Sequence, residues 1–315
     1  METNSSKEAY LQLCAERNDI SLFMQPWWLD AVCAGHEWQA LMSYDSDGEV
    51  IAACVYMIKK CLKMKYATLP PLCYDSCVWL RDTAADNEDT LKQITADWEQ
   101  HLSNEKIAYF KTLFDTESKL PKLMEQQQYR RRLRPAYKVQ HLNDLDNMLA
   151  NYSKSAKKEL QQALTLQADR DIEPENFYQI YESQFTAKGK EALYSREFFL
   201  VLYKKSQRLE QSQLLAIRNQ AGDIKAAALL IWDNNCMYAL MPYLAEDAQT
   251  SGAQALLYWE AQKFASQKVS KFDFCTIWKR HKASYARQYG GKVANTQQVS
   301  RVFNKWFWIV LPFVS

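Results

Sequence analysis

The segment from Tyr243 to Gln254 combines groups that can move a proton with a loop that can hold an anion. Tyr243 carries a hydroxyl, and Glu246 and Asp247 carry carboxylates, which can accept protons. The run Gln249-Thr250-Ser251-Gly252-Ala253 follows, directly before an apolar helical pattern. Successive backbone N–H groups at a helix N-terminus attract anions such as phosphate. The spacing therefore predicts a proton acceptor beside an anion-binding loop.

Each of these groups also has a structural interpretation. Thr250 or Ser251 would serve as an ordinary helix N-cap, satisfying free N–H groups of the first turn. Glu246 and Asp247 would then complement the dipole of that helix, as exposed carboxylates before helices commonly do. Tyr243 would be a packed aromatic residue. The sequence leaves both interpretations open.

A second candidate is Asp273, which lies between two phenylalanines in a short strand pattern. Alternation along a strand sends Phe272 and Phe274 to one face and Asp273 to the other. A buried carboxylate there needs a partner, either catalytic or structural. The structural alternatives are capping of the next helix and pairing with a nearby cation: Lys279, Arg280 or Arg287. Cys275 and His281 are spaced too loosely to indicate a thiol nucleophile with its base.

The densest positive charge is Arg130-Arg131-Arg132, followed by Arg134. Together with Lys154, Lys157 and Lys158, these residues are predicted to line a cleft between two domains and to bind phosphate groups. The alternative is a solvated linker strand. The four histidines show no metal-ligand spacing, so no metal site is expected.

Composition limits the class of protein. The chain has 315 residues, of which 48% are hydrophobic and 24% charged, with a net charge of +2. This is typical of a globular protein and argues against a DNA-binding coat protein. Only 7 glycines occur, which argues against a Gly-rich dinucleotide fold. No leader pattern or span of about 20 apolar residues is visible, so we expect a cytoplasmic protein without stable membrane insertion.

The elements that position these groups recur twice along the chain. Strand patterns flank Asp45-Ser-Asp-Gly48 in the first half and Gln220-Ala-Gly-Asp223 in the second, and both predict hairpins. Gly48-Glu-Val-Ile-Ala-Ala53 aligns with Gly222-Asp-Ile-Lys-Ala-Ala227 at a constant offset. A helix and a strand follow each hairpin. The shared order favours an internal duplication.

This repeat predicts two domains in a mixed α/β architecture with a mixed sheet. Residues 1–140 form the first and residues 141–303 the second, which carries the loop at Gly252. Residues 304–315 are expected to form a terminal strand that returns to the first domain. The contiguous apolar run Trp306–Val314 indicates a buried strand more than an amphipathic anchor.

The sequence resembles the Fem/GNAT-related N-acyltransferases, in which two acetyltransferase-like domains sit in tandem. The resemblance rests on four segments: Phe23-Met-Gln-Pro-Trp-Trp-Leu-Asp-Ala-Val32, Leu69-Pro-Pro-Leu72, Tyr152-Ser-Lys-Ser-Ala-Lys-Lys158, and the run Gly252 to Gly291 containing Lys271-Phe-Asp-Phe274. Two features depart from the family. Cys275-Thr276-Ile277-Trp278 replaces small residues after the strand, and the coiled-coil hairpin of relatives with transfer-RNA substrates is missing.

The resemblance implies transfer of an acyl or aminoacyl group to an amine acceptor in the interdomain cleft, such as an envelope or peptidoglycan precursor. Acyl-CoA, for example acetyl-CoA, is the favoured donor, and aminoacyl-tRNA is the other. Gln249 to Ala253 would hold the CoA pyrophosphate, although Gln254 stands where the family has a small residue. Glu246 or Asp247 would be the base, Tyr243 would assist the leaving group, and strand donors near Met241 would bind the oxyanion.

Two other classes of function remain open at this stage. One is a catalytically inactive member that binds a ligand or a protein, which is motivated by Gln254 and by Ile277-Trp278. The other is a binder of RNA that uses the arginine cluster without chemistry.

Overall fold

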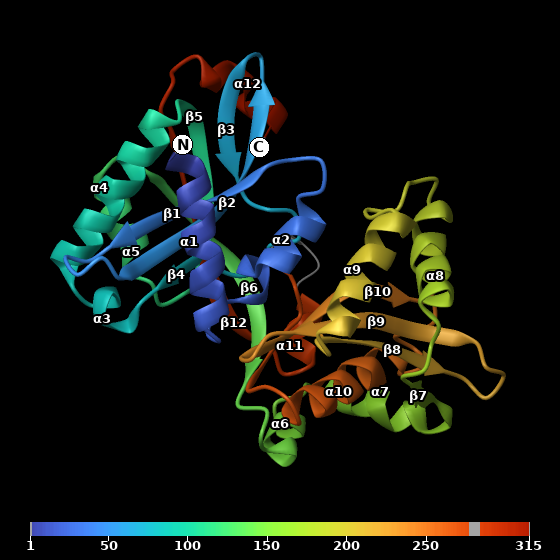
Figure 1. Ribbon diagram of the computed structural model, residues 1–315. Helices are drawn as coiled ribbons and strands as arrows, with labels where there is room; N and C mark the ends of the chain where they lie inside the picture. The colour runs from blue at the N-terminus through green and yellow to red at the C-terminus, as the bar shows by residue number, and fades with distance from the viewer. Residues whose placement is uncertain (1, 277–283, 315) are drawn as a thin grey trace. The chain divides into compact units, whose positions relative to one another are not determined.

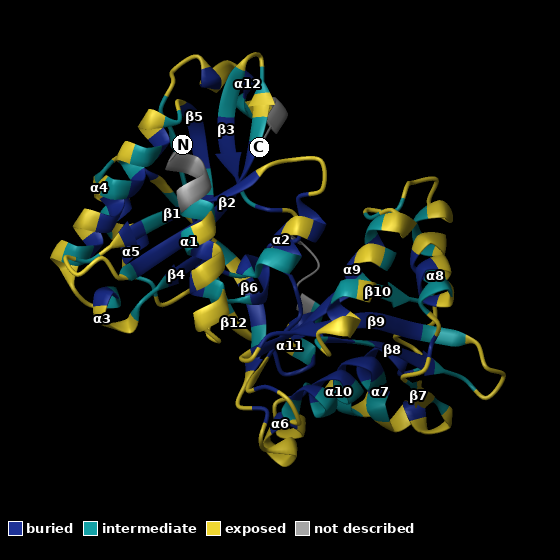
Figure 2. Ribbon diagram, viewed as in Figure 1, coloured by how far each residue is buried: buried dark blue, intermediate teal, exposed yellow. Residues whose placement is uncertain are grey.

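The computed structural model describes residues 2–276 and 284–314. It divides into two compact units. Unit 1 comprises residues 1–134 and 295–315, and unit 2 comprises residues 135–294. Strands β6 (Arg130–Gln140) and β12 (Lys292–Val302) contribute residues to both. Each unit is a mixed α/β structure, as the sequence predicts, with buried strands and helices whose outer faces are exposed (Figures 1 and 2).

Unit 1 is built on the neighbouring strands β1-β2-β3-β5-β12, with β4 beside β2. The β3–β5 pair is parallel, whereas β1–β2, β2–β3 and β5–β12 are antiparallel. The strands are β1 (Trp38–Tyr44), β2 (Val50–Cys61), β3 (Met64–Thr68), β4 (Val78–Leu80) and β5 (Ile107–Phe114). The helices are α1 (Glu2–Glu16), α2 (Pro26–Val32), α3 (Asp82–Ala85), α4 (Glu88–Asn104), α5 (Leu120–Gln126) and α12 (Phe307–Val314), with a short η1 (Leu22–Met24).

The core of unit 1 follows from the helical spacing of α4. Leu91, Ile94, Trp98 and Leu102 are buried in one cluster with inward residues of β2 and β5. The Asn87 side chain caps the helix by accepting hydrogen bonds from the Asp89 and Thr90 N–H groups. Helix α4 therefore covers part of one face of the sheet, and α1, α2 and α12 lie elsewhere on the unit (Figure 1).

Unit 2 has the strand order β6-β11-β10-β9-β8-β7, in which β10 and β11 are parallel. Its strands are β7 (Gln167–Asp169), β8 (Ser212–Arg218), β9 (Ile224–Trp232), β10 (Cys236–Leu244) and β11 (Lys271–Asp273). Its helices are α6 (Leu145–Ala150), α7 (Lys154–Gln162), α8 (Pro174–Thr186), α9 (Arg196–Arg208), α10 (Ala253–Ser266) and α11 (Ser284–Gln288), with a short η2 (Ala163–Thr165). Pro174 occupies the helix start predicted for it.

The two predicted hairpins have the same local structure. Gly48 and Gly222 both adopt left-handed φ angles, +82° and +87°, and donate to the carbonyl three residues earlier. In each turn, a side-chain oxygen of Asp45 or Asn219 accepts from the N–H four residues on. The β1–β2 register shifts after Ser43, and the β8–β9 register shifts at the equivalent place, after Ile217. These matching details support the internal duplication.

The C-terminal segment is a helix, and the expectation of a terminal strand is wrong. α12 buries Phe307 and Val310 against Tyr66 and Tyr109, but leaves Trp308 and Ile309 exposed. A contiguous apolar run is ambiguous between a buried strand and a helix, because both tolerate apolar residues at successive positions. The spacing of the two buried residues on α12 is that of a helix.

Packing of α12 yields a stability prediction. Phe307 is fully buried, stacks on the Tyr109 ring at a centroid distance of 5.4 Å, and lies equally close to Tyr66. Phe307→Ala is expected to lower the free energy of unfolding by about 3–4 kcal/mol, because it removes a buried aromatic ring. Trp308→Ala, at a position 58% exposed, should change it by less than about 0.5 kcal/mol. Urea denaturation of both variants checks this, and equal losses would contradict the packing described.

Candidate functional site

Strand β10 contains an irregularity just before the predicted site. The β9–β10 register shifts between Leu240 and Tyr243, and Met241 adopts φ +48°. Pro242 has no N–H, and its carbonyl accepts a hydrogen bond from the Gln184 side chain of α8 at 3.1 Å. This is a β-bulge, a feature that interrupts the ladder and is common beside active sites. It coincides with the segment near Met241 for which the sequence predicts oxyanion donors.

The predicted acid–base residues lie at the end of β10. Glu246 and Asp247 are exposed, and Lys225 donates to Asp247 at 3.0 Å. That hydrogen bond raises the pKa of Lys225. Burial raises the pKa of Tyr243, and the positive charge of Lys225 opposes the rise. Asp247 is thus committed to an ion pair, whereas Glu246 stays a candidate base.

Lys225 is a residue of this group that the sequence analysis missed. The Ala245 N–H donates to the Lys225 carbonyl, which places Lys225 two residues from Asp247 across the hairpin. Recognising the antiparallel pair of β9 and β10 and counting outward from the turn between them would have brought Lys225 near Asp247, because antiparallel pairing fixes which residues face each other.

The loop that joins β10 to α10 is held by hydrogen bonds among its own residues, and we call it the closed loop. Three of its N–H groups donate to loop carbonyls: Ser251 to Asp247 (2.8 Å), Gly252 to Gln249 (3.2 Å) and Gln254 to Ala248 (3.0 Å). The Thr250 hydroxyl also donates to a carbonyl, that of Asp247. The N-cap of α10 is Gly252 itself and no side chain caps the helix, so the N-cap role considered for Thr250 and Ser251 is wrong.

Gly252 is required by helix packing. Its φ is +80°, and a Cβ built on it would meet the Glu159 carbonyl oxygen at 2.1 Å and the Ala163 Cβ at 3.1 Å. Helix α7 therefore occupies the space next to Gly252, and α7 lies beside α10 in Figure 1. The Ser251, Gly252 and Gln254 N–H groups are bonded within the loop in this conformation, so these three would have to exchange their partners to bind a pyrophosphate.

A buried polar network holds α7 in place. The Glu159 carboxylate is 6% exposed and accepts from the Tyr289 hydroxyl at 3.0 Å and from the Ser155 hydroxyl at 3.2 Å. Burial, followed by the charge of Glu159, raises the pKa of Tyr289 above its ordinary range. Gln262 of α10 donates to the Tyr289 carbonyl at 3.0 Å. These bonds tie α7 to α10 and to the segment that precedes β12.

Asp273 is fully buried and lies in a row of polar side chains across three strands. It stands opposite Lys138 of β6 and beside Tyr238 of β10. Its Oδ1 accepts from the Cys275 N–H at 2.7 Å, and its Oδ2 lies 3.6 Å from the Lys138 ammonium nitrogen. The sequence analysis missed Lys138, because a residue so far away in the chain leaves no local signal.

Other partners considered for Asp273 have different positions. Arg287 lies over the Tyr137 ring at 5.3 Å. Lys279, Arg280 and His281 lie outside the described residues, as do Ile277 and Trp278.

The structure does not bring all the predicted catalytic residues together. Asp273 pairs in register with Tyr238, and Tyr243 follows five residues later on β10. At the rise of a β-strand this separation is roughly 16 Å. Tyr243, Glu246 and Asp247 form one group, and Asp273 lies apart from them.

The arginine cluster is divided between the two faces of β6. Arg131 donates to Gln297 at 2.7 Å and lies 3.8 Å from Glu125. Burial raises the pKa of Tyr109 of β5. The charges of Arg130, Arg132 and Arg134 oppose this rise, which indicates that all three lie on the side of β6 that faces Tyr109. Arg131 thus has structural partners on one face. Arg130, Arg132 and Arg134 share the other face, where Arg134 donates to the Gln298 side chain at 2.8 and 3.0 Å.

Two lysines complete this face. Burial, followed by the charges of Arg134 and Lys59, lowers the pKa of Lys111. We call this set the basic face of unit 1: Lys59, Lys111, Arg130, Arg132 and Arg134. Within the described part of the chain, no carboxylate forms an ion pair with Lys59, Lys111, Arg130 or Arg132. These four clustered cations without a carboxylate partner favour an anionic ligand.

The lysines predicted to complete the phosphate site lie on α7 of unit 2. Lys157 donates to the Ala150 carbonyl at 3.0 Å, and Lys158 is exposed. Their joint action with the arginines stays a prediction.

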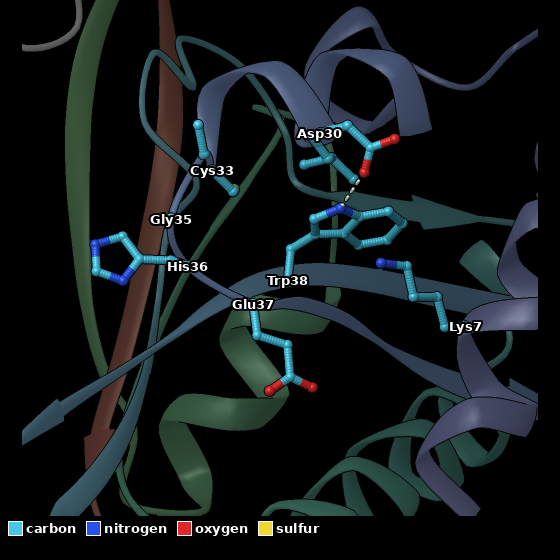
Figure 3. Close-up of a pocket in the computed structure, with 9 residues that line it drawn as sticks. Lys7, Asp30, Cys33, Gly35, His36, Glu37 and Trp38 are labelled. Atoms are coloured by element: carbon cyan, nitrogen blue, oxygen red, sulfur yellow. Dashed lines mark hydrogen bonds between the residues drawn. The ribbon is translucent and has the colours of Figure 1, made fainter.

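A shallow cavity of about 220 Å³ lies in unit 1 between α1, α2 and the start of β1 (Figure 3). Trp38 donates to Asp30 at 2.8 Å, and the Lys7 ammonium lies 3.8 Å from the Trp38 ring centroid. Figure 3 shows His36 and Glu37 pointing away from each other. Asp30 and Lys7 thus both contact Trp38, and the polar side chains of the cavity do not point toward one common position.

Residues 2–276 and 284–314 offer neither a candidate metal site nor a candidate membrane-spanning helix. They contain no cluster of three His, Cys, Asp or Glu side chains arranged to hold a metal ion. None of their helices combines the length and apolarity that crossing a bilayer requires.

Residues 147–283 match the acetyltransferase (GNAT) domain family. Comparison with curated proteins finds no sequence match. Among solved structures, FemX is similar over 98% of both chains, with 12% identity and a TM-score of 0.73. L-PGS from Bacillus licheniformis covers 98% of this chain and 96% of its own, with 11% identity and a TM-score of 0.55. A tandem GNAT protein from the clavulanic acid biosynthesis pathway covers 95% and 94%, with 11% identity and a TM-score of 0.51.

These comparisons confirm the predicted fold class. The chain contains a GNAT acetyltransferase domain in its second half and has, over its whole length, the fold of FemX and of a tandem GNAT protein. At identities of 11–12%, the structural likeness concerns the fold.

Gly252 provides a test of the closed loop. Gly252→Ala should lower the free energy of unfolding by at least about 2 kcal/mol, because the new Cβ would collide with the α7 backbone. Gly222→Ala is the matched control, since Gly222 has a similar φ but no atom within 4 Å of the added Cβ. It should lose only about 1 kcal/mol, the cost of a left-handed non-glycine residue. Chemical denaturation measures both, and equal losses would show that α7 does not pack there.

Proposed function

Starting from the GNAT domain and the FemX-like fold, we propose that this protein is an N-acyltransferase that uses an aminoacyl-tRNA as donor and an amine as acceptor. The single observation that carries the choice of donor is the closed loop before α10. GNAT proteins typically use acyl-CoA, but here three loop N–H groups, those of Ser251, Gly252 and Gln254, are bonded internally and α7 fills the space beside Gly252. A donor held by contacts outside this loop is therefore favoured over acyl-CoA.

The proposed reaction is an aminolysis of an ester. The acceptor nitrogen attacks the aminoacyl carbonyl carbon, the new C–N bond forms, and the C–O bond to the tRNA ribose breaks. The amine loses a proton, and the leaving ribose oxygen gains one. Such a step needs a neutral amine in position, N–H donors for the oxyanion, and a proton acceptor.

The residues near the β10 bulge are assigned to these tasks as part of the proposal. Glu246 is the candidate base, because Asp247 is paired with Lys225. Tyr243, on the same segment, is the candidate donor to the leaving oxygen. The bulge at Met241 supplies backbone N–H groups near the reacting carbonyl. Asp273, paired with Lys138, supports the position of β11 and takes no chemical step.

The basic face of unit 1 supports a donor that is rich in phosphate. Lys111 is half-buried between Lys59 and Arg134, and its lowered pKa shows that the positive charge is disfavoured there. Retaining such a cation costs stability unless a ligand neutralises it. A transfer RNA offers a phosphate on every nucleotide and would meet several of these side chains at once.

The proposal predicts donor binding and transfer with the full chain. Aminoacyl-tRNA should bind with an affinity that falls steeply with salt, and its label should move to a peptide amine. Lys111→Met should weaken binding and lower the slope of log affinity against log salt by about one. Lys122→Met, at an exposed position away from the basic face, is the control and should change neither.

Lys111→Met has a second expected effect that separates a binding role from damage to the fold. Because the pKa of Lys111 is lowered on folding, its charged form costs stability at neutral pH, and this cost disappears as pH rises through the folded pKa. The variant should therefore melt at a higher temperature than the wild type at pH 7, with a smaller difference at alkaline pH. Weaker binding accompanied by a lower melting temperature would count against the assignment.

Two outcomes would redirect the proposal. Transfer from acetyl-CoA without tRNA would contradict the choice of donor. Binding of aminoacyl-tRNA without transfer to any amine would favour the second candidate, an inactive binding module. That candidate is supported by the pairing of Asp247 and by the burial of Gln254 beside the closed loop.

A further inference from the structure

Helix α12 has one buried face and one exposed apolar face. Phe307 is fully buried against Tyr66 and Tyr109, and Val310 is 4% exposed. Trp308 and Ile309 point away from this contact and are 58% and 65% exposed. Both are large apolar side chains in water, on a helix already anchored through its other face.

Two further exposed apolar residues lie at the same end of unit 1. Trp306 immediately precedes the helix and is 73% exposed, and Leu62 at the β2–β3 turn is 74% exposed. Cys61 and Met64, on either side of that turn, pack in the same cluster as Phe307. Figure 1 accordingly draws α12 beside the β2–β3 end of the unit. We call Leu62, Trp306, Trp308 and Ile309 the apolar rim.

Five lysines lie close to the apolar rim along the chain or across the paired strands: Lys60, Lys63, Lys65, Lys106 and Lys305. Their positions follow from the strand pairing, since Lys65 stands opposite Ile107 and the Asn304 N–H donates to the Ala108 carbonyl. Glu105 pairs with Lys65 at 3.4 Å. The surroundings of the rim are therefore predominantly positive.

We propose that the apolar rim and its lysines dock unit 1 onto an anionic lipid bilayer. Exposed apolar side chains gathered in one place mark an interaction surface. Tryptophan favours the membrane–water interface, and leucine and isoleucine gain from reaching the acyl region. Lysines around them attract anionic headgroups. α12 has 8 residues and lies on the protein surface, so it would rest in the interface and not cross the bilayer.

The charges favour a bilayer over a second copy of the chain as the occupant. A two-fold dimer through the rim would place each lysine cluster against its own copy, because both subunits use the same surface. Like charges facing each other oppose such an interface. An anionic membrane satisfies the lysines and the apolar side chains together. The proposal is independent of the donor and acceptor of the transfer reaction.

The test is co-sedimentation of the full chain with vesicles. The protein should bind vesicles of equal parts phosphatidylglycerol and phosphatidylcholine, and should bind phosphatidylcholine alone weakly. Replacing Trp306, Trp308 and Ile309 together by Ser should reduce partitioning at least about tenfold, since interfacial affinity follows the buried apolar area. Lys63→Gln with Lys106→Gln and Lys305→Gln should also weaken binding and remove most of its salt dependence. Leu164→Ser and Leu193→Ser, at positions 88% and 71% exposed in unit 2, are matched controls and should bind as the wild type does.

A second readout covers a triple variant that fails to fold. Lipids brominated on the acyl chain should quench part of the wild-type tryptophan fluorescence, and Trp308→Phe should lose part of that quenching. The proposal is overturned if the wild type ignores phosphatidylglycerol vesicles, or if the folded triple variant binds like the wild type. It is also overturned if ultracentrifugation shows a wild-type dimer that the triple variant converts to monomers without any lipid binding.

Discussion

The close approach of α7 to Gly252 is the packing constraint on which the proposed choice of donor depends. A backbone carbonyl of α7 occupies the space where any side chain at position 252 would stand, and the Glu159 carboxylate on the same turn is held by Tyr289. Helix α7 thereby covers one side of Gly252 at the start of α10, and the Ser251, Gly252 and Gln254 N–H groups are bonded within the preceding loop. A segment with the composition of an anion-binding loop thus joins β10 to α10 and lets α7 pack against α10. The proposal of an aminoacyl-tRNA donor rests on this packing.

The same hairpin structure occurs in both units, but the strands that follow it differ. Asp45 and Gly48 in unit 1, and Asn219 and Gly222 in unit 2, build the same turn and the same register shift. In unit 2 the hairpin lies within the GNAT domain and leads to the bulged strand β10. In unit 1 the corresponding sheet carries Lys111 in a place where its charge is disfavoured.

The sequence predicted the parts of the structure whose signals are local. Both hairpins and the helix start at Pro174 follow from turn chemistry and periodicity, and the two-domain mixed α/β architecture follows from the repeat. The tandem GNAT-like fold came from the resemblance to the Fem/GNAT-related acyltransferases. The partners Lys138 and Lys225 were missed, because pairing across strands depends on register between distant segments. The packing requirement at Gly252 was missed for the same reason, since the atom that requires a glycine there belongs to residue 159. The helix α12 was taken for a strand, because an unbroken apolar run carries no period.

The central claim is that the loop before α10 is closed by its own hydrogen bonds and by α7. Amide hydrogen exchange of Ser251, Gly252 and Gln254, measured with and without saturating acetyl-CoA, tests it most directly. The account predicts slow exchange without CoA, because all three N–H groups are bonded internally, and no change when CoA is added. Fast exchange at these three amides that becomes protected on addition of acetyl-CoA would show an open, CoA-binding loop and would contradict the account.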